Sequence, residues 1–574
     1  HSENDGQDHS KPAKPQKAQI DSILKANITP KVHANEFGHL VIQDIGGRMM
    51  PVNTYASEML RKLSKSDAYE SFDANQVFLS IQESPLLWYN VPVIYLRARK
   101  GDSIRKLIGV SKEEEHVTLA DFFNERGEYV LAPYLNDAYQ AQVPNGFQKE
   151  FKETDQRVTL LYNAIEGMSL KIFPIPNDDN NKWISAYDYK RDRELNAKIE
   201  DSLYQNFIKN GFRSYLFSLN KAKQSQDFSE ASKLLGAFKK TQHQLGASVM
   251  LSDEKVKTEV LYNKYDIFKK LYSWYLYAGT LLFLLLIFQI FKDKNKALST
   301  SVKVFKYIII GLFVIHTLGL IARWYISGHA PWSDAYESMI YVAWATMLFG
   351  LLFGRKSDLT IAATAFVTSM ILMIAHWNWM DPAIANLQPV LDSYWLMIHV
   401  AVIVASYGPF TLGMILGIVS LLLMVFTTKE NKAKMLLSIK ELTIINEMAL
   451  TVGLVMLTIG NFLGGMWANE SWGRYWGWDP KETWALISIM IYAFVIHMRL
   501  IPGLRGRWFF NLMSIVAFAS IMMTYFGVNF YLAGLHSYAS GDQIVSLKFI
   551  GNACAIVAVL AFFAYRGYAK YYKK

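Results

Sequence analysis

The sequence contains very little cysteine: its single thiol, Cys554, lies inside the last apolar run of a 574-residue chain. One thiol cannot form an internal disulfide, a Cys-x-x-Cys redox pair or a cysteine-ligated metal site. Any thiol chemistry that the protein performs must therefore use the thiols of a substrate.

The start of the chain lacks a basic n-region and an apolar h-region, so no signal peptide is visible. It also lacks an initiator methionine, and we expect that processing or truncation has removed a segment upstream. The first residues are polar and rich in lysine, and no large aliphatic side chain occurs before Ile20. We interpret residues 1–19 as a disordered linker.

Acidic residues are outnumbered, with 49 Asp and Glu against 59 Lys and Arg, for a net charge of +10. In a soluble protein this excess would suggest an acidic partner. Here most of the excess lies in short links between apolar runs, where lysine and arginine orient helices across a membrane. Nucleic acid is therefore a poor candidate for a partner.

From Ser273 onward the chain is a series of apolar runs of about 20 residues, the length that crosses a bilayer as a helix. This pattern predicts a polytopic α-helical membrane protein with about nine transmembrane helices. We place the spans near residues 272–291, 305–326, 334–353, 358–376, 395–427, 442–466, 481–499, 508–531 and 545–565.

Positive charge is scarce in every second link between these spans. The cations of those links are Arg323, Arg474, Lys481 and Lys548. The other links and the C-terminal tail are rich in cations, for example Lys429, Lys432, Lys434 and Lys440 after the fifth span. Because cation-rich links stay in the cytoplasm, we expect the region before the first span to lie outside the cell membrane.

That outside region, residues 20–268, is expected to be a mixed α+β extracytoplasmic domain. Between residues 37 and 175, the short runs HLVIQD, VPVIYLRA, YVLAPYL and SLKIFPIP are bounded by Gly, Pro, Asn and Asp, which predicts strands. From about Arg191 to Leu271 the apolar residues have helical spacing. Helices are therefore expected to lead into the first span.

The segment from Trp467 to Trp484 is the most unusual part of the chain, because it holds five of the fifteen tryptophans. One interpretation is an interfacial aromatic belt, since tryptophan is favoured at headgroup depth. A belt spreads its aromatics over many helix ends, however, and does not require Gly473 and Gly477 beside the rings. We therefore favour an aromatic platform on which a flat apolar ligand stacks.

The string Asp479-Pro480-Lys481-Glu482 places an N-cap acid, a proline at the first helical position and a glutamate at the third. This is the pattern of a capping box. It would begin the seventh span at a defined residue and attach the aromatic segment to a rigid helix. Asp479 and Glu482 thus have a structural explanation, and a role as catalytic acids is the weaker hypothesis.

Histidines are the candidate metal ligands, although a lone histidine near a membrane surface is more often a structural residue. His399, early in the fifth span, and His536, after the eighth span, both face the outer side. Two converging neutral imidazoles can ligate a haem iron axially. His497 lies roughly 25 Å deeper than Pro480 at ~1.5 Å per helical residue. An ionisable residue inside the membrane is a functional candidate.

Three motifs carry a resemblance to a known family. The string WAxxxWGxxWxWDPKExW, the sequence LHSY and the stretch RWYISGHAPWSDAYESM resemble the CcsA half of the system II cytochrome c synthases, which are Trp-rich haem-handling membrane proteins. Upstream, GGRMMPVNTYASEMLRKLSK is similar to the end of the CcsB half of the fused proteins. The resemblance implies a last CcsB-like helix at 272–291, a CcsA-like domain at 305–574 and a Trp-rich loop at 465–484.

The resemblance also implies roles for individual residues. His399 and His536 would be the axial ligands of a haem b iron, and His497 would belong to a haem channel. The residues that would hold the haem are Trp467, Trp472, Gly473, Arg474, Trp476, Trp478, Asp479 and Trp484. The hypothetical partners of the haem propionates are Arg474, Lys481 and Arg323, each of which could instead tether lipid headgroups. For His316, in the second span, a structural hydrogen bond is the stronger interpretation.

The implied activity is that of a cytochrome c haem lyase on the periplasmic side of the bacterial cytoplasmic membrane. Haem would be attached through thioether bonds to an apocytochrome c that carries Cys-x-x-Cys-His. The implied partners are this apocytochrome, a thiol reductant system and the N-terminal CcsB portion. A haem transporter or chaperone without attachment activity is the alternative. A proton or quinone-linked pump would need paired acids or lysines within the spans, and the sequence contains almost none.

Overall fold

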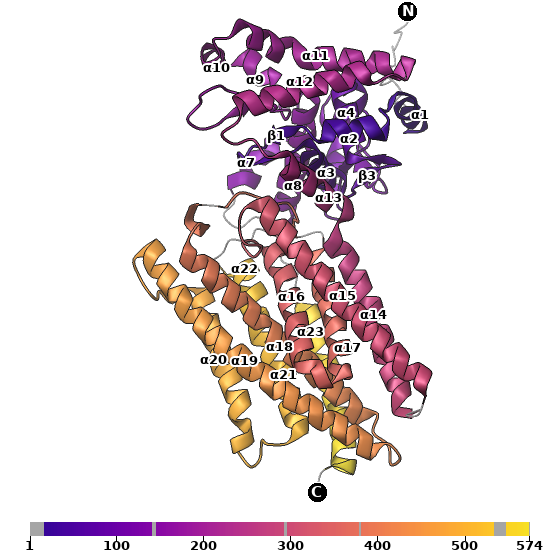
Figure 1. Ribbon diagram of the computed structural model, residues 1–574, viewed down its shortest axis with the longest axis vertical. Coiled ribbons are helices and arrows are strands. Elements are labelled where there is room, and N and C mark those ends of the chain that lie inside the picture. Colours follow the sequence, from indigo (N-terminus) through magenta and orange to yellow (C-terminus); the bar gives the residue numbers. More distant parts are fainter. Residues whose placement is uncertain are drawn as a thin grey trace, which may run out of the picture. The chain divides into compact units, whose positions relative to one another are not determined.

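The chain folds as two compact units, residues His1–Lys264 and Tyr265–Lys574 (Figure 1). The computed structural model describes residues 17–572 apart from residues 141–144, 292–294, 378–379, 388 and 533–546. Residues 1–16 of the predicted linker lie outside the described residues. The expected disorder is wrong for residues 17–19, because helix α1 (Lys17–Asn27) already begins there and buries Ile20 and Leu24.

The N-terminal unit consists mainly of helices around a large hydrophobic core, beside a smaller apolar cluster of Val41, Trp183 and Val256. After α1, its helices are α2 (Lys31–Gly38), α3 (Val52–Ser64), α4 (Ala74–Glu83), α5 (Pro85–Trp88), α6 (Asp102–Ile108), η1 (Leu119–Phe122), α7 (Ala132–Gln140), α8 (Gly146–Ile165), α9 (Ala186–Arg191), α10 (Arg193–Ala197), α11 (Ser202–Ser225), α12 (Ser229–Leu245) and α13 (Asp253–Tyr265). Long helices therefore follow residue 191, as the apolar spacing predicts.

Strands are present but short. Within the described residues they form antiparallel pairs, β1 (Val41–Gln43) with β2 (Met49–Pro51), β3 (Ala68–Tyr69) with β4 (Phe72–Asp73), β5 (Ile94–Tyr95) with β6 (His116–Val117), and β7 (Phe173–Pro174) with β8 (Trp183–Ile184). The predicted strand YVLAPYL is wrong, because α7 begins at Ala132. Pro133 stands in the first turn of that helix, where its missing N–H costs nothing.

The last helix of this unit is held by a buried charge. The Arg48 guanidinium lies 2.6 Å from the Glu259 carboxylate, and both side chains are buried. The Thr54 hydroxyl donates to the same carboxylate at 2.8 Å. These two partners satisfy the hydrogen-bonding capacity of the buried carboxylate and offset the cost of burying its charge. Through Glu259, α13 is therefore attached to α3 and to the segment before β2.

The second unit is a bundle of long helices. Among the described residues, nine helical segments are long and apolar enough to cross a membrane, which confirms the predicted fold class. The helices are α14 (Ile267–Phe291), α15 (Lys296–Ser327), α16 (Ala335–Phe353), α17 (Asp358–Ala375), α18 (Tyr394–Val425), α19 (Lys432–Trp472), α20 (Pro480–His497), α21 (Arg507–Met522), α22 (Val528–Tyr531) and α23 (Leu547–Tyr571). Short 3-10 turns η2 (Gly354–Lys356), η3 (Pro389–Leu391) and η4 (Met498–Leu500), with the π turn η5 (Met523–Gly527), adjoin them.

Helices α18 and α19 pack closely through three glycines of α19, which we call the glycine seam: Gly453, Gly460 and Gly464. A Cβ atom added at Gly453 would lie 2.9 Å from the Phe410 ring, and one at Gly460 would lie 3.0 Å from the Ile403 side chain. Small residues let two helix backbones approach when no hydrophobic effect drives association inside a membrane. The seam therefore sets the spacing of the pair, which Figure 1 shows running side by side.

A buried polar contact joins α19 to α21. The Asn446 amide donates to Asn511 at 3.2 Å and to the Ser514 hydroxyl at 3.0 Å. The Asn511 amide in turn donates to the Thr443 hydroxyl at 2.9 Å. Such side-chain hydrogen bonds between helices fix their register inside the membrane.

Candidate functional site

The Trp-rich segment is divided between two helices and a short link. Helix α19 continues as far as Trp472, and Gly473 ends it with a φ of 68°. The predicted loop at 465–484 is therefore wrong, because only residues 473–479 lie outside helices. Residues 465–472 contain no proline and a single glycine, Gly465, so the helix continues through them, whereas Gly473 adopts the left-handed C-cap conformation without strain.

His399 lies in the second turn of α18 and points at the glycine seam of α19. Its Nδ1 atom is 2.7 Å from the Gly460 carbonyl oxygen. A carbonyl oxygen only accepts, so Nδ1 carries a proton, and in the neutral form of the imidazole the lone pair is on Nε2. A Cβ atom at Gly464 would lie 2.5 Å from Cε1 of the ring, so the imidazole occupies space that only glycine leaves open.

Two tryptophans and an arginine extend this contact toward the end of α19. The Trp467 ring is fully buried and lies parallel to the His399 ring, with 6.4 Å between centroids and 10° between planes. Trp472 meets Trp467 edge to face at 4.7 Å. The Arg474 guanidinium lies 5.4 Å above the Trp472 ring, a cation–π distance. These side chains thus form one continuous series of ring and cation contacts from His399 to Arg474.

Glu482 organises the link between α19 and α20. The predicted capping box of Asp479 and Glu482 is confirmed, with Pro480 at the start of α20. The Glu482 carboxylate also accepts from the Gly477 backbone N–H at 2.9 Å and from Arg474 at 3.2 Å. One side chain therefore caps the helix, folds the link and pairs with its cation.

Two glycines leave room for this folded link. A Cβ atom at Gly477 would overlap the Arg474 guanidinium, and one at Gly465 would lie 3.1 Å from the Tyr475 carbonyl oxygen. The link consequently turns back against the end of α19. Trp478 adopts a φ of 56°, an uncommon conformation for a bulky residue.

The remaining tryptophans form a second, more open group. Trp476 and Trp478 meet edge to face at 5.7 Å, and Trp478 is 71% exposed. Trp484 lies partly buried in the second turn of α20. The structure thus brings Trp467 and Trp472 together with His399, and it places Trp476, which is half-buried, and the exposed Trp478 as a separate pair on the link.

The three candidate partners of the haem propionates differ in their surroundings. Arg474 pairs with Glu482, and the Lys481 ammonium donates to the Asn529 side chain at 3.3 Å. Arg323 is fully buried, 2.8 Å from Glu337, and it donates to the Pro382 carbonyl oxygen at 3.0 Å. A buried guanidinium with these partners does not tether headgroups or meet a ligand at the surface. The alternative role of Arg323 as a tether for lipid headgroups is therefore wrong, and its role as a propionate partner stays a prediction.

Two other histidines of the membrane unit, His497 and His316, lie apart from this site. His497 is the last residue of α20, exposed, with Nδ1 2.6 Å from the Ala493 carbonyl oxygen. His316 is buried, and its Nε2 atom is 3.1 Å from the Ile340 carbonyl oxygen, which confirms its structural hydrogen bond. His536 lies outside the described residues, so its assignment stays a prediction.

A second aromatic group, which the sequence reasoning did not single out, contacts the first turns of α18. The Trp332 indole N–H donates to the Met397 carbonyl oxygen at 3.2 Å. Trp332 also packs against Trp324 at 5.6 Å and against Tyr341 at 4.8 Å. The stretch RWYISGHAPW contained this signal, because it places two tryptophans on either side of one turn. Through Trp332, this group connects α15 and α16 to the first turns of α18.

The fold and site define a polytopic membrane protein in which a histidine, a glycine seam and a tryptophan cluster meet near the ends of three helices. A family model described as cytochrome C assembly protein matches residues 332–536. The cytochrome c biogenesis protein CcsA of Prochlorococcus marinus is 33% identical over 291 residues, which are 45% of this chain and 92% of that protein. The chain belongs to the cytochrome c assembly family, and the resemblance stated from the Trp-rich string is confirmed.

Protein NrfI of Wolinella succinogenes is similar over both units, at 38% identity over 517 residues, or 88% of this chain. The chain spans 55% of the length of NrfI. A CcsA protein of Synechococcus is 37% identical over 250 residues, which are 39% of this chain and 82% of that protein. A solved structure named cytochrome c heme lyase CcmF shares 14% identity and a TM-score of 0.37, covering 52% of this chain and 51% of its own.

Proposed function

We propose that this protein attaches haem to apocytochrome c on the outer face of the bacterial cytoplasmic membrane, as a haem lyase. The observation that carries the proposal is the 2.7 Å contact between His399 Nδ1 and the Gly460 carbonyl oxygen, in a chain of the cytochrome c assembly family. A histidine that ligates a metal usually donates its second ring N–H to a carbonyl or carboxylate, which fixes its tautomer and raises its basicity.

His399 would be one axial ligand of the haem iron, and His536 the other. Nε2 of His399 holds the lone pair that an iron accepts, because Nδ1 donates to Gly460. With both histidines bound, the iron would have no free position for a further ligand. The histidine of the Cys-x-x-Cys-His segment would then replace one of them when the substrate binds.

The tryptophans would have two roles. Trp467 is fully buried behind His399, so it holds the imidazole in place rather than offering a face to the haem. Trp476 and Trp478, on the exposed link, would contact the macrocycle through their large apolar faces. Trp472 and Arg474 join these groups, and Arg474 would hold a propionate on the side away from Glu482.

The reaction needs no nucleophile from the protein. Each substrate thiol adds across a haem vinyl group, so that one C–S bond forms and the thiol proton ends on the neighbouring vinyl carbon. The protein would supply placement of the two reactants, which can lower the barrier by several kcal/mol. A reductant must keep the substrate thiols reduced, which makes a thiol reductant system the expected partner.

Co-expression with an apocytochrome tests attachment directly. In a bacterium without its own assembly proteins, the chain and a Cys-x-x-Cys-His apocytochrome should yield haem that stays bound after denaturation. A Ser-x-x-Ser-His substrate is the control that should yield none. A further arm of the experiment co-expresses the N-terminal CcsB portion, which is the expected partner of this chain. Haem released outside without thioether product in every arm would contradict attachment and support the alternative, a haem transporter.

A further inference from the structure

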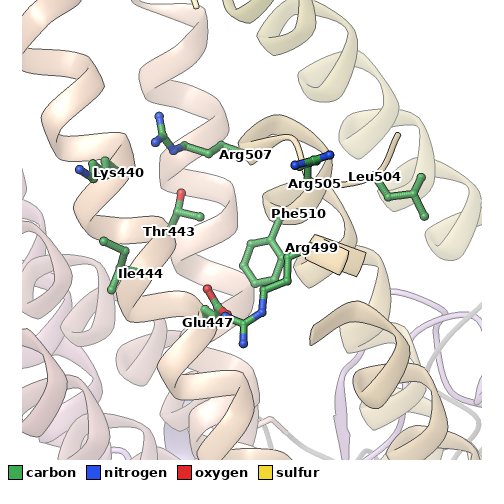
Figure 2. A pocket seen from close by; sticks show the side chains of 9 residues that line it. All are labelled: Lys440, Thr443, Ile444, Glu447, Arg499, Leu504, Arg505, Arg507 and Phe510. Carbon is green, nitrogen blue, oxygen red and sulfur yellow. The ribbon is translucent and has the colours of Figure 1, made fainter. Parts of the chain in front are cut away.

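A cavity lies at the end of the bundle opposite the tryptophan cluster, between α19, α20 and α21 (Figure 2). Its volume is about 210 Å³. The residues that line it are Lys440, Thr443, Ile444, Glu447, Arg499, Leu504, Arg505, Arg507 and Phe510. Four of these side chains are cationic and one is anionic, so the cavity is strongly basic.

Most of this positive charge is not neutralised by the protein. Arg499 forms an ion pair with Glu447. Among the ion pairs of the described residues, none within 4.0 Å includes Lys440, Arg505 or Arg507. Figure 2 shows these three side chains along the upper edge of the cavity, with the Glu447 pair below. Clustered like charges repel, and an anion bound among them relieves the repulsion.

The cavity lies at the ends of two candidate membrane spans, which indicates how deep in the membrane its ligand binds. Arg499 lies next to the end of the span Pro480–Leu500, and Arg507 begins the span Arg507–Gly527. Both guanidinium groups therefore stand where a bilayer changes from acyl chains to headgroups. Guanidinium groups match the geometry of phosphate oxygens through paired hydrogen bonds.

Part of the cavity wall is apolar and is formed by residues such as Phe510 and Ile444. Phe510 is buried, whereas Ile444 is 50% exposed on the surface of α19. A ligand that binds the cations with its head can thus place an apolar chain along Ile444. A free inorganic anion would leave this apolar surface unused. Basic cavities between transmembrane helices commonly bind anionic headgroups.

We propose that this cavity is a binding site for the phosphate headgroup of an anionic membrane lipid, such as a phosphatidylglycerol. Lys440, Arg505 and Arg507 contact the phosphate oxygens, and Ile444 contacts an acyl chain. The bound lipid holds the ends of α19, α20 and α21 together at the membrane surface. The site is separate from the proposed haem site and does not depend on attachment activity.

Native mass spectrometry of the delipidated full-length chain tests this site. Phosphatidylglycerol should bind in a saturable way, with at least tenfold higher affinity than phosphatidylcholine of the same chain length. The variant K440Q/R505Q/R507Q should lose at least tenfold of this affinity. The matched control K356Q/K429Q removes exposed cations from other links of the domain and should change the affinity less than twofold.

Several results would overturn the proposal. Equal affinity of the wild type and the triple variant, or equal affinity for the two lipids, would exclude a headgroup site here. Saturation by inorganic phosphate alone at the same affinity would identify a soluble anion as the ligand. Competition by haem for the same cations would show that propionates are the ligand instead. The triple variant changes only exposed or half-exposed side chains. The single variant R505Q removes one exposed cation, and a loss of affinity in that variant as well shows that the loss does not come from misfolding.

Discussion

His399 owes its orientation to the backbone of another helix. The Gly460 carbonyl oxygen accepts from its Nδ1 atom, and Gly464 leaves the space in which the ring lies. Neither residue has a side chain that could be recognised as functional. At the scale of single residues, the position of the His399 ring therefore depends on two glycines without side chains as much as on the histidine itself.

A methyl group at Gly464 should disturb the site. In Gly464→Ala the added Cβ atom meets His399 Cε1 at 2.5 Å, so the ring must move away from Gly460. We expect the haem content of the purified protein to fall several-fold, measured from the Soret absorbance. The control Gly311→Ala places its Cβ atom in open space on α15 and should retain haem. Equal haem content in both variants would contradict the proposed orientation of His399.

Removal of the Glu482 carboxylate should loosen the link between α19 and α20. Glu482→Ala loses the capping box, the Gly477 hydrogen bond and the Arg474 pair together. Loss of a helix cap alone costs about 1 kcal/mol. Hydrogen exchange in residues 474–479 should therefore become at least fivefold faster. Glu430→Ala, in an exposed turn, is the control, and unchanged exchange in Glu482→Ala would refute the role given to this carboxylate.

At the scale of elements, the sequence predicted which segments of the membrane unit form helices, but it did not predict where each helix begins and ends. The apolar runs predicted each span because length and hydropathy are local properties. The 41 residues of α19 exceed what a bilayer needs, so its ends depend on packing and on Gly473. The partner of His399 lies 61 residues further along the chain. The spacing of Gly453, Gly460 and Gly464 on one helix face was the available signal.

Overpacking of the glycine seam should destabilise the bundle. Gly453→Val adds a branched side chain where a Cβ atom alone already lies 2.9 Å from Phe410. Excess volume in a packed core costs roughly 1–3 kcal/mol. The midpoint of thermal unfolding in detergent should fall by several degrees. Val455→Leu, on the face of α19 where Val455 is 53% exposed, should leave the midpoint unchanged. A fall of equal size in both variants would point to a general effect of larger side chains.

At the scale of the whole molecule, the distribution of polar and apolar residues predicted the division of the chain into two parts. The short apolar runs of the N-terminal part predicted strands less well. HLVIQD contains β1, but YVLAPYL enters a helix because short apolar runs do not separate the two structures. His536 lies outside the described residues, so its convergence with His399 stays a prediction.

The orientation of the membrane unit can be tested with single cysteines. The chain has only Cys554, so Cys554→Ser supplies a cysteine-free background. Tyr475, in the link after α19, is 65% exposed, and Lys429 follows α18 at the opposite end. Cation-rich links stay inside, so Tyr475→Cys should react with a membrane-impermeant maleimide in intact cells, and Lys429→Cys should react only after permeabilisation. Labelling of Lys429→Cys in intact cells would contradict the orientation.

The absorption spectrum of the haem bound to the purified protein tests the central assignment most directly. Wild type should show a six-coordinate, low-spin haem. His399→Ala should lose that spectrum or most of the haem, and added imidazole should restore it by filling the vacated ligand position. His376→Ala, which removes a histidine hydrogen-bonded to the Leu372 carbonyl oxygen at the end of α17, should match the wild type. An unchanged spectrum and haem content in His399→Ala would show that His399 does not ligate the iron.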